Sequence, residues 1–326
     1  MNQQSEIIRL KLLKRYYKTA ALGWFHPKSL HWAKMVTNDG YWKWIRPHSG
    51  IRNRLVRNPP IHLYQSVLRI KSENAPRGSK TKGYFLGGNL LFDIDIIEKK
   101  APFSIWKVID AVDSIKPLVE TIEDMGGFRL KQIVFSGFRG FHVYFEEVET
   151  IRTPICTNEK NQRWLLRAFT QKRNQLARAV GYWLPEWDWK VSADIWRVAR
   201  VPWSIHGNSS LRAIPLKKSL SSRILKDSFN QACVFSDTRN LSIRMLRKVP
   251  TFSYIDGVTY GPFRKDWTTK LPVSVALHLI WQDFAKLREK GLEKAGLWFK
   301  ESWQTLFRDA AMNFSMGNFI NGGDGS

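Results

Sequence analysis

The chain has 326 residues, and its 52 Lys and Arg against 28 Asp and Glu leave a formal net charge of +24. Hydrophobic residues make up 43% of the chain and aromatic residues 13%, including 15 Trp, which excludes a disordered basic tail. A folded protein with this excess of positive charge is expected to bind a polyanion, usually nucleic acid; charge that serves solubility alone is the alternative.

Cysteine content and hydropathy exclude further classes. Two cysteines, Cys156 and Cys233, are too few for a disulfide scaffold or an all-cysteine zinc site, and they indicate a reducing compartment. No apolar run approaches the roughly 20 residues of a membrane helix, and no signal-peptide core follows Met1. We therefore expect a soluble, intracellular protein, cytoplasmic and nucleoid-associated, with no membrane partner.

Positive charge is concentrated at the N-terminal end, where residues 1–70 carry 13 Lys and Arg against two acidic residues. Basic and aromatic residues interleave there, as in the segment 41–46 with Trp42 and Trp44. Such a surface suits single-stranded nucleic acid, because the cations can bind phosphates while the rings stack on bases. The alternative is that the two tryptophans line one buried face of a strand.

Hydrophobic periodicity predicts the following elements in chain order. Helices are expected over 7–21, 103–125, 162–183, 273–290 and 293–312. A strand or short helix is expected over 61–70, and strands over 84–97, 128–135 and 141–147. The segments 72–82 and 150–161 are expected to be loops and 136–140 a turn. The strand 84–97, the helix after it and the strand 128–135 then form a β-α-β unit.

The strand 84–97 contains two acids, Asp93 and Asp95, among aliphatic and aromatic residues. Side chains two apart on a strand share a face, about 7 Å apart. Two anions on one apolar face repel each other and resist desolvation, so a pair of divalent cations is expected to compensate them. Carboxylate oxygens favour Mg²⁺ or Mn²⁺. The alternative is an edge strand with a hydrated polar face.

A glycine-bracketed turn follows, in which Ser136 and Arg139 lie between two apolar strands and His142 begins the second strand. Gly137 and Gly140 permit a close backbone approach. Each of the three polar side chains can donate a hydrogen bond to phosphate, so the turn is a candidate triphosphate site. An ordinary hairpin with a solvated arginine and a core histidine is the alternative.

The third segment, 187–207, contains Asp188 between two tryptophans. Ser192 is expected to cap a helix that ends at Pro202, with Asp194 in its first turn in a structural role. Arg197 and Arg200 would then share one helix face. Asp188 precedes that helix and has no such structural explanation.

These motifs in this order resemble the small catalytic subunit of archaeo-eukaryotic primases. The resemblance rests on DID, on SGFRGFH, and on an Asp followed by RVPWSIHG. PIHLYQS at 60–66 and LP with VAL at 271–277 extend it over about residues 10–290. A plasmid-type primase-polymerase is the expected variant.

The resemblance implies an α/β (α+β) fold, with an RRM-like antiparallel catalytic sheet beside an N-terminal α/β layer and with flanking and C-terminal helices. It implies one catalytic domain, 1–312, with a flexible tail at 313–326. Within the domain we expect a basic N-terminal part at about 1–82, a catalytic core at 83–250 and C-terminal helices at 270–312.

The resemblance also implies the roles of individual residues. It implies Asp93, Asp95 and Asp188 as catalytic metal ligands. The residues implied around the nucleotide triphosphate are Ser136, Arg139, His142 and His206, with Arg200 either holding the site together or reaching phosphate.

Two departures from the family are visible. Residues 96–135 contain neither Cys nor His, so we predict no structural zinc in the position where replicative members often carry it. Asn208 stands where the family commonly has a Lys after the second His, and Arg212 is the candidate substitute.

The resulting prediction is a DNA primase and DNA-directed polymerase that extends or initiates a strand by two-metal nucleotidyl transfer. Its expected partners are single-stranded DNA template, primer and nucleoside triphosphates, with a large primase subunit or a fused regulatory domain as a further candidate. A gap-filling repair polymerase and a catalytically inert binding module are the alternatives. The sequence does not distinguish ribo- from deoxyribonucleotides.

Overall fold

The computed structural model describes residues 3–20, 22, 31–46, 50–71, 84–96, 103–148, 159–181, 194–216, 228–235 and 239–288. These residues form helices and antiparallel sheets, so the fold class is α+β, as predicted. None of the described helices is long and apolar enough to cross a membrane. They are α1 (Gln3–Thr19), α2 (Ile51–Arg57), α3 (Ile105–Asp124), α4 (Glu159–Gly181) and α7 (Val273–Trp281).

One sheet has the strand order β2–β1–β3–β4, and β8 also pairs with β3. We call it the β3 sheet. Its buried residues Ala33, Met35 and Leu63 belong to the same core as Leu12 of α1 and Leu55 of α2, so these amphipathic helices cover it. Its strands are β1 (His31–Val36), β2 (Trp42–Ile45), β3 (His62–Lys71), β4 (Tyr84–Gly88) and β8 (Val198–Arg200).

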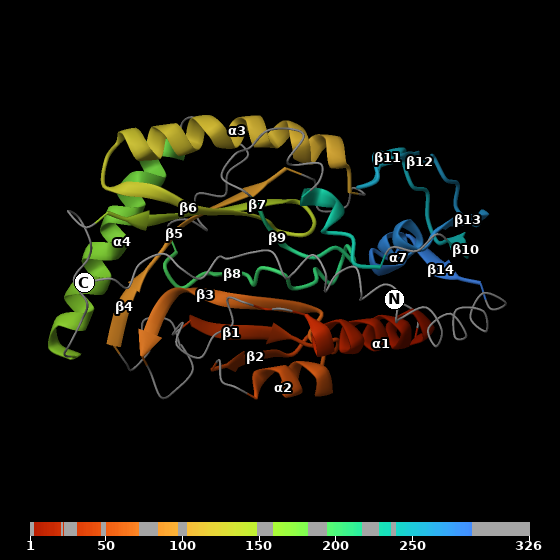
Figure 1. The fold of residues 1–326 in the computed structure, drawn as a ribbon, viewed down its shortest axis with the longest axis horizontal. Helices are drawn as coiled ribbons and strands as arrows, with labels where there is room; N and C mark the ends of the chain where they lie inside the picture. Colours follow the sequence, from red (N-terminus) through yellow and green to blue (C-terminus); the bar gives the residue numbers. More distant parts are fainter. Residues whose placement is uncertain are drawn as a thin grey trace.

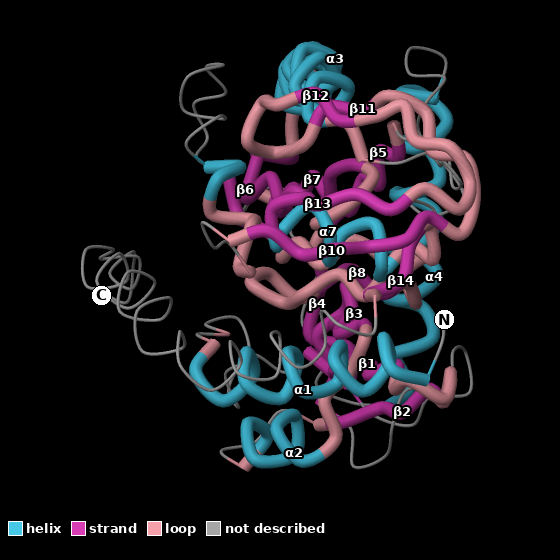
Figure 2. The backbone as a smooth tube through the Cα atoms, turned by 90° about the vertical axis from the view of Figure 1, so that its right-hand side faces the viewer, coloured by secondary structure: helices cyan, strands magenta, loops and turns pink. Residues whose placement is uncertain are grey.

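A second sheet has the order β5–β7–β6–β9, and we call it the β7 sheet. Helix α3 connects β5 to β6, which lie on either side of β7, so the predicted β-α-β unit is present with a strand inserted. Figure 1 shows α3 lying along this sheet, and Figure 2 shows α1 and α2 at the opposite end of the molecule. Its strands are β5 (Leu90–Asp95), β6 (Phe128–Phe135), β7 (Gly140–Glu147) and β9 (Ile214–Leu216).

The segment between the two sheets corrects the prediction of a single strand over 84–97. The strand is interrupted at Asn89: the part before it, β4, pairs with β3, and the part after it, β5, pairs with β7. Gly87 has a φ of +100°, and a Cβ on Gly88 would meet a Leu68 methyl at 2.9 Å. The glycines therefore permit the change of sheet. A small buried cluster joins the sheets, and its members are Val67, Leu91, Val134, Tyr144, Ala199 and Ala213.

The prediction of a helix between Ser192 and Pro202 is wrong for the residues that the structure describes, 194–202. Residues 194–197 form a turn in which Asp194 accepts the backbone N–H of Trp196 at 2.9 Å. Val198–Arg200 then form β8, which pairs with β3 and buries Ala199 and Arg200. Arg197 and Arg200 therefore do not share a helix face. Hydrogen bonds to an available neighbouring strand outweigh local helix signals here.

The C-terminal helix is shorter than the predicted 273–290. Helix α7 ends at Trp281, Asp283 takes a positive φ of 59°, and β14 returns to pair with β10. The smaller C-terminal strands are β10 (Asn240–Met245), β11 (Phe252–Ser253), β12 (Thr259–Tyr260), β13 (Thr268–Pro272) and β14 (Ala285–Leu287).

Several predictions fall wholly or largely outside the described residues. These are the loops at 72–82 and 150–161, the helix at 293–312, the tail at 313–326, Cys156, Asp188 and Ser192. The helix predicted over 162–183 is confirmed as α4, with its start three residues earlier.

Candidate active site

The two acids of the DID motif lie in β5, directly beside β7. The register sets Asp93 opposite His142 and Asp95 opposite Gly140. Phe92 and Ile94 are buried with the residues of α3, so the alternation of a strand directs both acids to the other face. Asp93 is half-buried and Asp95 is exposed. The two carboxylates therefore share one accessible face of the β7 sheet.

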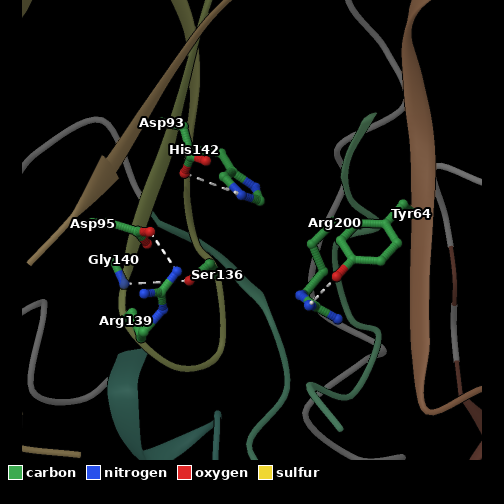
Figure 3. Close-up of polar contacts among 8 residues, drawn as sticks. All are labelled: Tyr64, Asp93, Asp95, Ser136, Arg139, Gly140, His142 and Arg200. Carbon is green, nitrogen blue, oxygen red and sulfur yellow. Dashed lines mark hydrogen bonds and ion pairs between the residues drawn. The ribbon is translucent and has the colours of Figure 1, made fainter. Parts of the chain in front are cut away.

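Each acid meets a nitrogen from the neighbouring hairpin (Figure 3). An Nη2 of Arg139 lies 2.5 Å from Oδ2 of Asp95, and Nε2 of His142 lies 3.6 Å from Oδ1 of Asp93. Burial lowers the pKa of His142 to about 4, and the charge of Arg200 acts in the same direction. His142 is therefore neutral at pH 7, and the charge on Asp93 is not cancelled by an imidazolium.

The glycines of the turn at 136–140 are required by the space available. A Cβ on Gly140 would lie 1.6 Å from the carbonyl oxygen of Ile94, which no side chain can occupy. Gly137 has a φ of +88°, in the left-handed region that favours glycine. The hydroxyl of Ser136 accepts the Gly140 N–H at 3.3 Å. Together these constraints close the turn so that Arg139 reaches Asp95.

Arg200 lies on β8, buried, opposite Tyr64 of β3. Its Nη2 donates to the Tyr64 hydroxyl at 3.0 Å and to Nδ1 of His62 at 3.2 Å. Its guanidinium also lies over the Tyr64 ring, 4.7 Å from the centroid. The sequence argument missed His62 and Tyr64 as site residues. The available signal was the pair of polar rings, His62 and Tyr64, at alternate positions of a predicted strand.

His206 connects this group to the glycine turn. Its ring centroid lies 5.0 Å from that of His62 and 5.2 Å from that of Phe138. The backbone N–H of Asn208 donates to Nδ1 of His206 at 3.2 Å, so the neutral ring carries its proton on Nε2. Burial, with the charges of Arg200 and Arg139, lowers the pKa of His206 well below its usual value. His206 therefore remains neutral.

The segment after His206 is supported by α7. Ser209 donates its hydroxyl hydrogen to the Gly137 carbonyl, and its own carbonyl accepts from Nδ1 of His278 at 2.6 Å. Arg212, the candidate substitute for the missing lysine, contacts other groups: its Nε donates to the Gln231 carbonyl at 2.6 Å, and its guanidinium lies over Trp203. Asn208 itself is exposed.

The structure thus brings together all the predicted site residues that it describes. Two acids lie beside five neutral or cationic donors, three of the hairpin and two of the 200–206 segment, and the pKa of His206 responds to charges from both groups. Within the described residues no set of three His, Cys, Asp or Glu is arranged as a metal site. Asp93 and Asp95 supply two carboxylates, which suit a hard divalent cation, and Asp188 falls in the undescribed segment 182–193.

Nδ1 of His142 adds an independent observation. It is a buried ring nitrogen with no hydrogen-bond partner among the described residues. Buried polar atoms of folded proteins are normally paired, and an exception calls for an explanation such as a bound ion or ligand. The ring faces Asp93 through its other nitrogen, Nε2, so the unpaired Nδ1 belongs to a side chain that adjoins the acidic pair.

Comparison with known proteins gives a consistent result. No family model matches the chain. The DNA primase small subunit PriS of Pyrobaculum islandicum is 24% identical over 271 residues, which cover 73% of this chain and 84% of that protein. The Pyrobaculum calidifontis PriS is 26% identical over 276 residues with the same coverage. The Methanocella arvoryzae PriS is 25% identical over 263 residues, 69% of this chain and 64% of that protein.

Among solved structures, the polymerase domain of Mycobacterium tuberculosis ligase D in complex with DNA matches with a TM-score of 0.42 and 12% identity. The match covers 64% of this chain and 80% of that one. The family resemblance predicted from the order of motifs is confirmed by the archaeal relatives.

Proposed function

This chain belongs to the archaeo-eukaryotic primase superfamily, and we propose that it is a DNA-dependent primase-polymerase that adds nucleotides to a strand on a single-stranded template. The reaction is attack of a 3′ hydroxyl on the α-phosphorus of a nucleoside triphosphate, which forms a phosphodiester bond and releases pyrophosphate. If the enzyme initiates strands, a second nucleotide supplies the hydroxyl.

Asp93 and Asp95, completed by Asp188, would hold two Mg²⁺ or Mn²⁺ ions. When bound, these ions supply Lewis-acid activation of the hydroxyl and charge neutralisation on the leaving pyrophosphate. The accessible shared face of the two acids supports this role, because carboxylate oxygens there can reach a cation that arrives from solvent. Arg139 orients Asp95 through their ion pair.

The hairpin and the 200–206 segment would bind the triphosphate. Arg139 brings a fixed positive charge, whereas the neutral His142 and His206 bring hydrogen-bond donors in a buried environment. Donors fixed before the reaction stabilise charge that develops on phosphate oxygens without a cost of reorganisation. Arg200 holds His62 and Tyr64 beside them.

One observation supports the proposal most directly: the β5–β7 register sets the acidic pair against the turn of Ser136 and Arg139, the hydrogen-bond donors proposed for phosphate. Nucleotidyl transfer requires metal ligands close to hydrogen-bond donors that bind phosphate. A protein that only binds a polyanion gains nothing from two accessible carboxylates there. A large primase subunit remains a proposed partner.

The test replaces both acids with isosteric amides, D93N/D95N, and measures incorporation of labelled nucleotide on a primed template with Mg²⁺ or Mn²⁺. We expect a loss of at least about a thousandfold, because the metal ligands are removed, while binding to single-stranded DNA persists. The matched control is D113N, an exposed Asp on α3, which should leave synthesis unchanged. Synthesis retained by the double variant would refute the assignment.

Further substrates separate the alternatives. Unprimed single-stranded DNA with each nucleotide type tests initiation and sugar preference. A strong preference for gaps with a 5′ phosphate would favour the repair polymerase. Absence of incorporation by the unmodified protein on every substrate would favour the inert binding module.

A further inference from the structure

One face of the β3 sheet carries a row of aromatic and basic side chains, whose outer members Lys34, Trp42 and Trp44 have no part in the proposed chemistry. The strand register sets Trp44 of β2 opposite Lys34 of β1, Lys34 opposite Tyr64 of β3, and Tyr64 opposite Arg200 of β8. Residues directly opposite across antiparallel strands project from the same face. Trp42, two residues before Trp44, shares this face.

The row is continuous through side-chain contacts. The Trp42 and Tyr64 rings are nearly parallel, with centroids 5.9 Å apart and an interplanar angle of 16°. The ammonium of Lys34 lies 3.9 Å from the Trp42 ring centroid and 5.5 Å from that of Trp44. At its inner end Tyr64 accepts the hydrogen bond from Arg200. The contacts therefore run from the candidate active site to the outer strand β2.

The outer end of the row is open. Trp42 is 49% exposed and lies on β2, the edge strand of the sheet, whereas Trp44 is half-buried against a second apolar cluster. The sequence left two alternatives for Trp42 and Trp44, stacking on bases or lining a buried strand face. The exposure of Trp42 excludes the buried face for this residue. An exposed ring on an edge strand, continuous with further rings and a cation, is a candidate binding surface.

The charge of the row is also uncompensated. No carboxylate of the described residues lies within ion-pair distance of Lys34. Burial lowers the pKa of Lys34, and the charge of Arg197, which precedes β8 and is itself paired with Asp194 at 3.3 Å, acts in the same direction. A negatively charged group placed here would be stabilised.

We propose that this row is the track along which the unpaired template strand reaches the active site, with a base stacked on Trp42 and a phosphate held by Lys34. The proposal rests on the proposed function, since it assigns the template of that reaction. Base stacking on aromatic rings combined with backbone contacts to cations is the usual way to bind a single strand without sequence preference.

The dimensions agree with this ligand. Four strands, from β8 to β2, span three inter-strand spacings, about 14 Å in total. That length corresponds to about four nucleotides at 3.4 Å per stacked base. A duplex is a poor fit, because its bases are already stacked on one another and offer Trp42 no free face.

The experiment compares W42A with the wild-type protein in binding labelled primer-templates that have 5′ overhangs of one or eight nucleotides, without nucleotide or metal. On the long overhang we expect W42A to bind at least about fivefold more weakly than the wild type. On the short overhang and on blunt duplex its affinity should lie within about twofold of the wild-type affinity. W42F, which keeps a ring, should recover most of the affinity. W106A and W267A remove tryptophans of similar exposure, 47% and 50%, on other elements and should match the wild type.

Equal binding by W42A on all substrates would overturn the proposal, and so would an equal loss on all of them. A template with 5-iodouracil placed two to four nucleotides beyond the primer end should crosslink to a peptide that contains Trp42. This measurement on the wild-type chain decides the case even if W42A folds poorly. Crosslinking elsewhere, with none on β2, would overturn it.

The test is independent of catalysis. If D93N/D95N keeps full synthesis while W42A shows the overhang-dependent loss, the assignment of the chemistry fails and that of the track stands. If D93N/D95N is inactive and W42A binds normally, the track fails and the proposed function stands.

Discussion

The β7 sheet and the β3 sheet present functional side chains in opposite ways. On the β7 sheet the acids and their partners come from one hairpin and its neighbouring strand, and the turn has no space even for one added carbon at Gly140. On the β3 sheet the row from Arg200 to Trp42 is collected from four strands and ends in a half-exposed ring.

The difference reflects what each region is proposed to do. Chemistry at a phosphorus atom depends on positions held to fractions of an ångström, so its residues lie in a tight, locally determined turn. Stacking and charge tolerate variation, so a binding surface can be open. Changes in the β7 sheet should therefore act nearly all-or-none, and changes in the β3 sheet should act by degrees.

The largest effect is expected from G140A in the tight turn. The new Cβ would coincide with the Ile94 carbonyl, so the β5–β7 pairing beside Asp95 must separate. We expect a loss of about 4 kcal/mol or more in the free energy of unfolding, measured by denaturant titration. G126A is the control, since its φ is +70° and its surroundings are open, and it should cost about 1 kcal/mol. Equal stabilities would contradict the contrast.

An intermediate effect is expected where the two regions meet. R200K keeps the charge but cannot reproduce the paired contacts of the guanidinium with Tyr64 and His62. We expect unfolding to be easier by about 2 to 3 kcal/mol and kcat/KM for nucleotide incorporation to fall at least about tenfold. Unchanged values for R200K would show that charge alone matters here. R129K, at an exposed ion pair with Glu146, should behave as the wild type.

A smaller effect is expected from pH, through the support beneath the glycine turn. His278 donates from Nδ1 to the Ser209 carbonyl, so its Nε2 accepts from the Gln282 amide and cannot be protonated in place. Burial lowers its pKa to about 4. Below pH 6.5 the unfolded chain binds a proton that the folded chain refuses, so stability falls as the pH falls from 6.5 toward 4.

For this group alone the loss between pH 7 and pH 5 is about 2 kcal/mol. In H278Q the dependence of unfolding free energy on pH over this interval should be shallower by that amount, as measured by urea titration at each pH. Parallel curves for the two proteins would contradict the assignment. The exposed Asn208 offers the matched control N208A, which should keep the steep dependence.

Local patterning predicted those elements whose burial is decided within their own sequence. Helix α3 and strands β6 and β7 appear at or within two residues of the predicted bounds, because their apolar periodicity is strong and uninterrupted. The acidic pair and the glycine turn were visible for a related reason. Acids in a strand and paired glycines break the local pattern, and such exceptions mark function.

Three elements were not predictable in this way. The break at Asn89, the strand β8 and the end of α7 at Trp281 each depend on a partner strand distant in sequence, namely β7, β3 and β10. A propensity of a few tenths of a kcal/mol per residue cannot oppose a row of hydrogen bonds to such a partner.

The sequence alone therefore indicated the family resemblance, the acidic pair and the polar residues of the turn, because these reside in short motifs with their own chemistry. Tertiary structure decided that Arg200 extends from a strand rather than a helix, that His62 and Tyr64 join His206, and that Trp42 stays open at the sheet edge. The physical reason is strand pairing: register, which no local segment encodes, chooses which side chains become neighbours.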